Sequence, residues 1–145
     1  MKITRLDTYF LAIPLPQPVR TSTSTISQVS EVIVKLTTDA GLVGIGEGHG
    51  PFLLRQGPEG IRVVNEIMQQ ITPLVVGEDP FNVERIWQDL FALTYTSVRG
   101  IPPLARQQRQ LVTAMSAIDI ALWDLMGKAT ERLFLPGRDG LAWVK

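Results

Sequence analysis

Hydrophobic and polar residues alternate with a period of two over much of the first fifty positions, which is the pattern of half-buried β-strands. The segment SEVIVKLTTD places three apolar residues on one face, Val32, Val34 and Leu36. An earlier segment, residues 3–13, is rich in aromatic and β-branched residues and ends in the proline-broken stretch PLPQP. The turn DAG at residues 39–41 returns the chain through LVGIGEG, and so short a connection predicts an antiparallel pair.

From residue 58 onward the apolar period changes to the 3.6 residues of an amphipathic helix. The segment PEGIRVVNEIMQQI begins with Pro58, which suits a first turn, and we expect Pro73 to end or kink this helix. Asp79 followed by Pro80 predicts the N-cap of a second helix. The side chains that the two helices are expected to bury are Ile61, Val64, Ile67, Met68 and Ile71, and then Val83, Ile86, Trp87, Leu90 and Phe91.

A third helix is predicted after a loop at residues 97–105. Its apolar positions form one stripe, which comprises Leu111, Ala114, Met115, Ile118, Leu122 and Leu125. Asp124 and Lys128 lie four residues apart on this helix, the spacing of a modest surface ion pair. Strands followed by helices predict an α+β domain.

Four glycines, at positions 44, 46, 48 and 50, raise the question of a phosphate-binding loop. A dinucleotide loop needs the pattern G-x-G-x-x-G between a parallel strand and a helix. Here His49 occupies the third glycine position, Pro51 follows, and the segment is expected to pair back on its neighbour. We interpret the glycines instead as a bare strand face that another backbone or a helix approaches closely.

Composition narrows the class of protein. The chain has 145 residues, enough for one domain, with 45% hydrophobic and 19% charged residues. Its 14 basic and 14 acidic residues balance, so neither nucleic acid nor an anionic membrane is predicted as a partner. The absence of cysteine excludes disulfides, thiolate nucleophiles and cysteine zinc sites. We found neither a signal peptide nor an apolar run of about 18 residues, and the cytoplasm is the default location.

The chemistry-bearing residues form no recognisable catalytic set. His49 is the only histidine, and it is read either as a surface residue or as a polar contact to a ligand. Asp119 and Asp124 lie about 140° apart around one helix, so they are not expected to converge and a structural role is favoured. Three arginines, Arg99, Arg106 and Arg109, could form an anion site, although a solvated surface is the favoured reading.

Three segments together resemble a known family. They are MKITRLDTYFLAIPLPQPVRTST, VIVKLTTDAGLVGIGE and TAMSAIDIALWDLMGKA. They resemble the N-terminal capping domain of the mandelate racemase / muconate lactonizing enzyme group of the enolase superfamily. The resemblance implies a three-stranded antiparallel sheet followed by a bundle of three or so helices, with the TIM barrel absent. On this basis residues 1–128 form the capping domain and residues 129–145 a divergent tail.

The resemblance also implies a chemistry. Enzymes of this family abstract the proton α to a carboxylate and use Mg²⁺ to stabilise the enediolate. Their metal ligands and bases sit in the barrel, whereas the capping domain contributes two loops that close over the substrate. The matching positions are residues 16–30 and 47–57. This makes the candidate substrate contacts Arg20, Thr21, Ser22 and His49, with no catalytic residue, metal ligand or cofactor in this chain.

The sequence departs from the family after Ala129. A barrel takes roughly 250 residues, and TERLFLPGRDGLAWVK is all that follows here. The departure suggests a frameshift, a truncated gene or an artificially shortened chain, with a split enzyme as a further possibility. Every metal ligand and base of the family's mechanism would then lie on another polypeptide.

Three hypotheses follow. The chain is the capping domain of an acid-sugar dehydratase, racemase or cycloisomerase, inactive alone; or it is a standalone binding or scaffold module; or it folds with a separately encoded barrel. The first predicts an apolar barrel-facing surface and self-association through it. Six apolar residues in expected loops or tail favour that outcome, namely Phe52, Leu53, Leu54, Phe134, Leu135 and Trp143. The identity of the acid depends on the loops and the barrel together.

Overall fold

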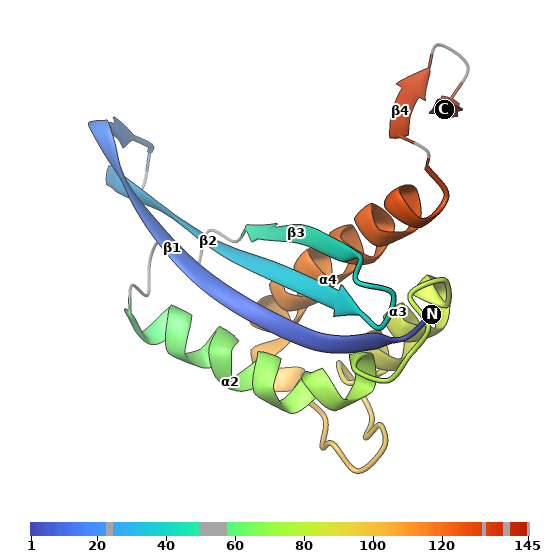
Figure 1. Cartoon of the computed structure of the whole chain (residues 1–145). Helices are drawn as coiled ribbons and strands as arrows, with labels where there is room; N and C mark the ends of the chain where they lie inside the picture. The colour runs from blue at the N-terminus through green and yellow to red at the C-terminus, as the bar shows by residue number, and fades with distance from the viewer. Residues whose placement is uncertain (23–24, 50–57, 132, 138–139, 145) are drawn as a thin grey trace.

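A computed structural model describes residues 1–22, 25–49, 58–131, 133–137 and 140–144 (Figure 1). Its elements in chain order are β1 (Ile3–Arg20), β2 (Thr25–Thr38), β3 (Val43–His49), α2 (Pro58–Val75), α3 (Val83–Ala92), η1 (Ala105–Gln107), α4 (Gln108–Ala129), β4 (Leu133–Gly137) and β5 (Gly140–Val144). The first three strands form an antiparallel sheet in the order β1-β2-β3, and the helices lie against one of its faces. The predicted α+β fold with a three-stranded sheet is confirmed.

The hairpin of β1 and β2 is longer than the sequence predicted. Residues 16–30 were expected to form a loop, but β1 continues to Arg20 and β2 begins at Thr25. The prolines of PLPQP do not end β1 because it is an edge strand, where a residue without a backbone N–H can be accommodated. Their cost is a register irregularity between Pro14 and Val19.

The last residues also differ from expectation. Residues 133–137 and 140–144 pair as the antiparallel hairpin β4–β5, although a tail or loop was predicted there. Phe134, Leu135 and Trp143 therefore lie in strands. The predicted loop residues Phe52, Leu53 and Leu54 fall outside the described residues.

The helix α2 passes through Pro73 and ends two residues later, so the proline does not terminate it. Leu74 and Val75 are fully buried, and their packing holds this last turn in helical form. Four of the five expected core residues of α2 are buried, the exception being the half-buried Ile61. No helix in the part of the chain that the structure describes is long and apolar enough to cross a membrane.

The helix α3 corrects two predictions. It begins at Val83 rather than after Asp79, whose carboxylate accepts a hydrogen bond from the Phe81 N–H (3.0 Å) in the preceding turn. Trp87 and Phe91, expected in the core, are exposed and stack on each other with ring centroids 4.8 Å apart. The short helix buries only the stripe Val83, Ile86 and Leu90, where it contacts α4 and α2, and its two large aromatic side chains remain exposed.

The contact between β3 and α4 explains the glycines. All three described glycines of β3 face a ridge of small residues on α4, in the pairs Gly44–Ala121, Gly46–Ala117 and Gly48–Thr113. Two strand residues advance about 6.7 Å and four helix residues about 6 Å, so the two repeats stay in step. A Cβ on Gly46 would lie 1.9 Å from the Ala117 carbonyl oxygen. Only glycine permits this approach of helix to strand, as the sequence predicted for these positions.

Side chains of α4 also close the free edge of β3. The Asp124 carboxylate accepts a hydrogen bond from the Ile45 N–H (2.8 Å), and the Lys128 ammonium donates to the Val43 carbonyl (2.8 Å). Asp124 and Lys128 form the predicted ion pair at 2.6 Å. The pair thereby occupies backbone groups that an edge strand would otherwise offer to another chain.

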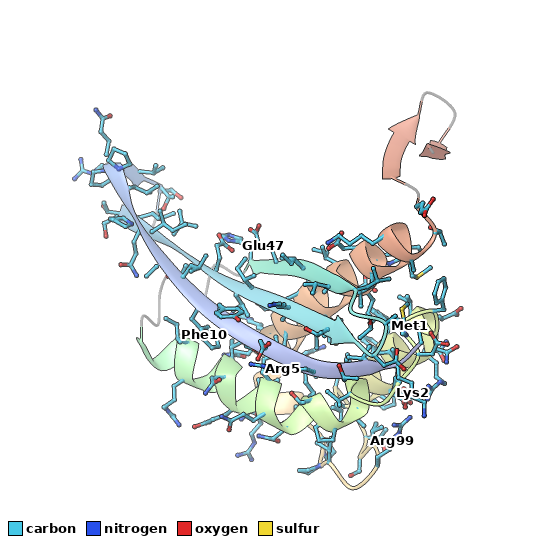
Figure 2. The ribbon with its side chains drawn as sticks, in the orientation of Figure 1. Met1, Lys2, Arg5, Phe10, Glu47 and Arg99 are labelled. Carbon is cyan, nitrogen blue, oxygen red and sulfur yellow. The ribbon has the colours of Figure 1, made fainter. Side chains whose placement is uncertain are left out.

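A network of ion pairs connects the segment before α3 with α3 itself and with the loop after it. Glu78 accepts hydrogen bonds from Arg85 and from Arg99, and Arg99 also reaches Asp89 (3.0 Å). Arg99 lies in the loop after α3 (Figure 2) in a left-handed backbone conformation. Its guanidinium is paired with two carboxylates, which agrees with the favoured reading of a surface arginine over an anion site.

Candidate functional site

The four predicted substrate contacts lie at two separate places. Arg20 is the last residue of β1, with Thr21 and Ser22 directly after it, and all three are exposed at the tip of the long hairpin. His49 is the last residue of β3. Figure 1 shows the hairpin extending well beyond the end of β3.

The strand register gives the separation. Arg20 pairs with Thr25 on β2, whereas His49 pairs with Glu31 on the same strand. Six residues of an extended strand span about 20 Å. The structure therefore brings Arg20, Thr21 and Ser22 together and keeps His49 apart from them.

His49 is held by a neighbour that the sequence analysis missed. Its Nδ1 lies 2.7 Å from the Oε1 of Glu31, and Thr113 donates a hydrogen bond to the His49 carbonyl (3.5 Å). The His49 side chain is 52% exposed and that of Glu31 only 11%. The carboxylate orients the ring through Nδ1, which leaves Nε2 as the atom through which the ring would contact a ligand.

The strand register of β2 and β3 could have identified Glu31 as the partner of His49. The short turn at residues 39–41 pairs Thr37 with Val43, and counting outward from that pair puts Glu31 opposite His49. Glu47, the acidic residue two positions before His49 in the sequence, pairs with Ile33 and lies on β3 itself (Figure 2). The second carboxylate oxygen of Glu31 is buried and lacks a hydrogen-bond partner among the described residues.

A guanidinium, two hydroxyls and an imidazole can bind an anionic, hydroxylated molecule through charge-assisted hydrogen bonds. They do not make a metal centre. Within the described ranges, no cluster of three or more histidine, aspartate or glutamate side chains could hold a metal ion. These residues therefore do not fit a Mg²⁺ site, and what they can supply is binding and orientation.

A second feature lies on the helical side of the molecule. A groove of about 340 Å³ between α3 and α4 is lined by Phe81, Val83, Glu84, Trp87, Asp119, Trp123 and Met126. Burial raises the pKa of Asp119, and a hydrogen bond from Trp123 partly opposes that rise. Asp119 faces this groove and Asp124 faces β3, so the two carboxylates do not converge, as predicted.

Comparison with known proteins identifies the family and its similar members. Residues 5–133 match the family model described as mandelate racemase / muconate lactonizing enzyme, N-terminal domain. N-succinyl-L-Arg/Lys racemase from Bacillus cereus is 34% identical over 128 residues, covering 88% of this chain and 31% of that protein. D-galactarolactone cycloisomerase from Agrobacterium fabrum is 34% identical over 142 residues, covering 95% of this chain and 33% of that protein.

A solved structure agrees with these matches. The substrate-liganded L-Ala-D/L-Glu epimerase from Bacillus subtilis has a TM-score of 0.66 at 25% identity, covering 90% of this chain and 32% of that one. The chain thus spans about a third of the length of each of these three relatives.

Proposed function

Because this chain belongs to the family of mandelate racemase / muconate lactonizing enzyme N-terminal domains, we propose that it is the capping domain of a Mg²⁺-dependent enolase-superfamily enzyme. The enzyme would remove the proton α to the carboxylate of a small organic or sugar acid, as a dehydratase, racemase or cycloisomerase. The chain would supply specificity and would be inactive without a barrel. The observation that carries this proposal is that residues 5–133 match the N-terminal domain model of the family. The relatives that this chain matches are about three times as long.

The proposed substrate contacts come from the tip of the β1–β2 hairpin and from the end of β3. Arg20, Thr21 and Ser22 on the hairpin tip and His49, oriented by Glu31, are the proposed contacts to the acid. They lie about 20 Å apart along β2, farther than a small acid extends, so both groups can reach the same molecule only if the hairpin tip bends towards His49 in the complete enzyme. Closing such loops over a substrate excludes water from the reacting atoms.

The metal belongs to the barrel in this proposal. Mg²⁺ would supply charge stabilisation when bound there, and the described residues of this chain provide no site for it. The part of this chain is limited to binding the acid, orienting it and excluding water.

The test uses the full 145-residue chain and the barrel portion of the Agrobacterium fabrum cycloisomerase, the part outside its matched third. Exchange of the α-proton of a panel of sugar acids is followed in D₂O by proton NMR. Exchange is expected only when both polypeptides are present. The matched control is the same barrel with its own N-terminal third. Turnover by the pure chain, or no exchange where the control exchanges, would contradict the proposal.

Substitution sharpens the test at the predicted contacts. Arg20→Ala and His49→Ala are each expected to raise KM about tenfold, the loss of one charged hydrogen bond. Tyr9→Ala, an exposed residue on the sheet away from both groups, is the control and should leave KM unchanged. Equal effects of all three variants would show a general loss of structure rather than loss of substrate contacts.

The alternative is a standalone binding or scaffold module. Such a module should present polar side chains on its free surfaces. The described helical surface is instead rich in exposed aromatic residues, Phe81, Trp87, Phe91, Tyr95 and Trp123. This favours a domain that works against a partner, with self-association as a further consequence in the isolated chain.

A further inference from the structure

The face of the β1-β2-β3 sheet that points away from α4 is not covered by any described helix (Figure 1). We propose that two copies of this chain associate through this outer sheet face. The Lys35 ammonium of each copy pairs with the Glu47 carboxylate of the other, around a shared apolar centre. This association is separate from the capping function proposed above and does not depend on it.

Strand alternation identifies the residues of the outer sheet face. Gly44, Gly46 and Gly48 pack on α4, and the residues that alternate with them, Ile45 and Glu47, therefore project to the opposite side. The strand register then assigns their neighbours on β2 and β1. The face consists of three cross-strand rows, Asp7–Lys35–Ile45, Tyr9–Ile33–Glu47 and Leu11–Glu31–His49.

Apolar side chains form the centre of this face. Tyr9 and Ile33 are directly opposite each other on β1 and β2, and Ile45 lies one row away on β3. Ile45 is 51% exposed, Tyr9 48% and Leu11 42%, whereas Ile33 is half-buried. Exposed apolar side chains that are contiguous rather than scattered are typical of a surface that binds another protein.

The charged residues of the face identify the partner. The Asp7 and Glu31 carboxylates each have a basic partner within the chain at 2.7 Å. Lys35 and Glu47 form no ion pair with any residue that the structure describes. The centre of the face therefore retains one cation and one anion, and a surface with one of each is complementary to a second copy of itself.

The strand register allows both ion pairs to form around one two-fold axis. Lys35 and Glu47 lie diagonally across the square that they form with Ile33 and Ile45. An axis between two stacked sheets, along the Ile33–Ile45 diagonal, places each Lys35 over the Glu47 of the other copy. Ile33 and Ile45 then meet their own counterparts near the axis. The strands of the two sheets cross at a steep angle, close to the orthogonal class of sheet packing, and the contact closes as a dimer.

The size of the face sets the expected affinity. Three strands about 4.8 Å apart and three rows about 6.7 Å apart give a projected area of roughly 300 Å² in each copy. Interfaces that bury less than about 1,200 Å² in total are typical of weak, transient complexes. We therefore expect a dimer with a Kd of about 10–100 μM, which is populated at high protein concentration.

The test is sedimentation equilibrium of the full chain over concentrations that span the expected Kd. Lys35→Glu and Glu47→Lys each bring like charges together twice in a dimer, so each should raise Kd at least about tenfold. An equal mixture of the two variants should form a heterodimer with the parent affinity, because residues 35 and 47 again carry opposite charges at both contacts. Glu84→Lys makes the same charge change on α3 and is the control, with Kd expected to change less than about twofold.

Crosslinking tests the position of the axis. The sequence contains no cysteine, so Ile45→Cys introduces a single thiol that should lie close to its own counterpart in the dimer. The short crosslinker bismaleimidoethane should then join two copies. Tyr95→Cys, at a more exposed position after α3, is the control and should not be joined under the same conditions. Circular dichroism of each variant separates loss of association from loss of folding.

The results distinguish this surface from other occupants and other faces. Rescue in the mixture together with the Ile45→Cys crosslink would support the outer sheet face. A monomer at every concentration, or loss of association in both single variants without rescue, would overturn it. A dimer that Trp123→Ala dissociates and that both charge variants leave intact would place association on the helical surface. These measurements use the chain alone, so their failure leaves α-proton exchange and the proposed function untouched.

Discussion

The two sides of α4 differ in how completely they are packed. Towards β3, small residues such as Ala117 meet bare glycines at backbone contact, and Asp124 and Lys128 occupy the strand edge. Towards α3, the same helix presents Asp119 and Trp123 to an open groove. One side is closely packed among the described residues, and the other leaves Trp87 and Trp123 partly exposed at the groove.

The largest expected effect on stability is at the contact between α4 and β3. Gly46→Ala places a Cβ where the Ala117 carbonyl oxygen lies 1.9 Å away, so helix and strand must separate. We expect a loss of about 3 kcal/mol in the free energy of unfolding, the upper range for overpacking. Urea denaturation measures it, with Ile45→Ala, whose side chain is exposed, as the neighbouring control. A loss under about 1 kcal/mol would show that this contact is looser than the structure has it.

A smaller effect is expected at the edge of β3. Asp124→Ala removes the acceptor of the Ile45 N–H and the partner of Lys128. We expect a loss of about 1 kcal/mol, the net value of an accessible hydrogen bond and ion pair. Hydrogen exchange should speed up at Ile45, whereas Asp124→Asn, which keeps an acceptor, should preserve part of the protection. Unchanged exchange in both variants would exclude this edge-closing role.

The contribution of the Glu78 ion pairs to stability should depend on pH. Hydrogen bonds from Arg85 and then Arg99 hold the pKa of Glu78 below its ordinary value of 4.5. A lowered pKa stabilises the folded state above pH 4.5, and this contribution is lost as the pH falls through the folded pKa. Glu78→Gln should therefore lower Tm at pH 7 by a small amount, and the difference from the parent should shrink below pH 4. A constant difference across this range would contradict the assignment.

The smallest effect on stability is expected at Asp119, on the side of α4 that faces the groove. Burial raises the pKa of Asp119 above its ordinary value of 3.8, so ionisation at neutral pH slightly destabilises the free chain. Asp119→Asn should be marginally more stable than the parent at pH 7, and this advantage should disappear as the pH falls towards 3. Thermal melts of the free chain at both pH values measure it. Destabilisation at pH 7 would indicate that the carboxylate is already satisfied within the chain.

Local patterns foretold much of the fold. The two-residue alternation around Val34 and the 3.6-residue stripe through Ile118 each specify which face is buried, and both faces are buried in the structure. The misses occurred where packing overrides a local preference. Pro73 is accommodated because the two residues after it are buried, and Trp87 remains exposed because it lies outside the stripe of α3 that contacts α4 and α2.

The candidate site was predictable in its parts but not in its arrangement. Arg20 and His49 were identified from the resemblance, and the strand register then separated them by about 20 Å. Glu31 was missed although the hairpin register contained it. The groove at Asp119 had no signal in the local sequence, because its walls come from helices that are distant along the chain.

The sequence by itself determined that the sheet strands precede three α-helices, the glycine face of β3 and the family, because these depend on periodicity and on residue types at short spacing. Only the tertiary structure decided what each surface does. The length of the hairpin, the partner of His49 and the open side of α4 depend on which elements pack together and where packing stops. The local sequence pattern therefore predicts which side chains are buried, whereas the surfaces that remain exposed depend on the whole fold.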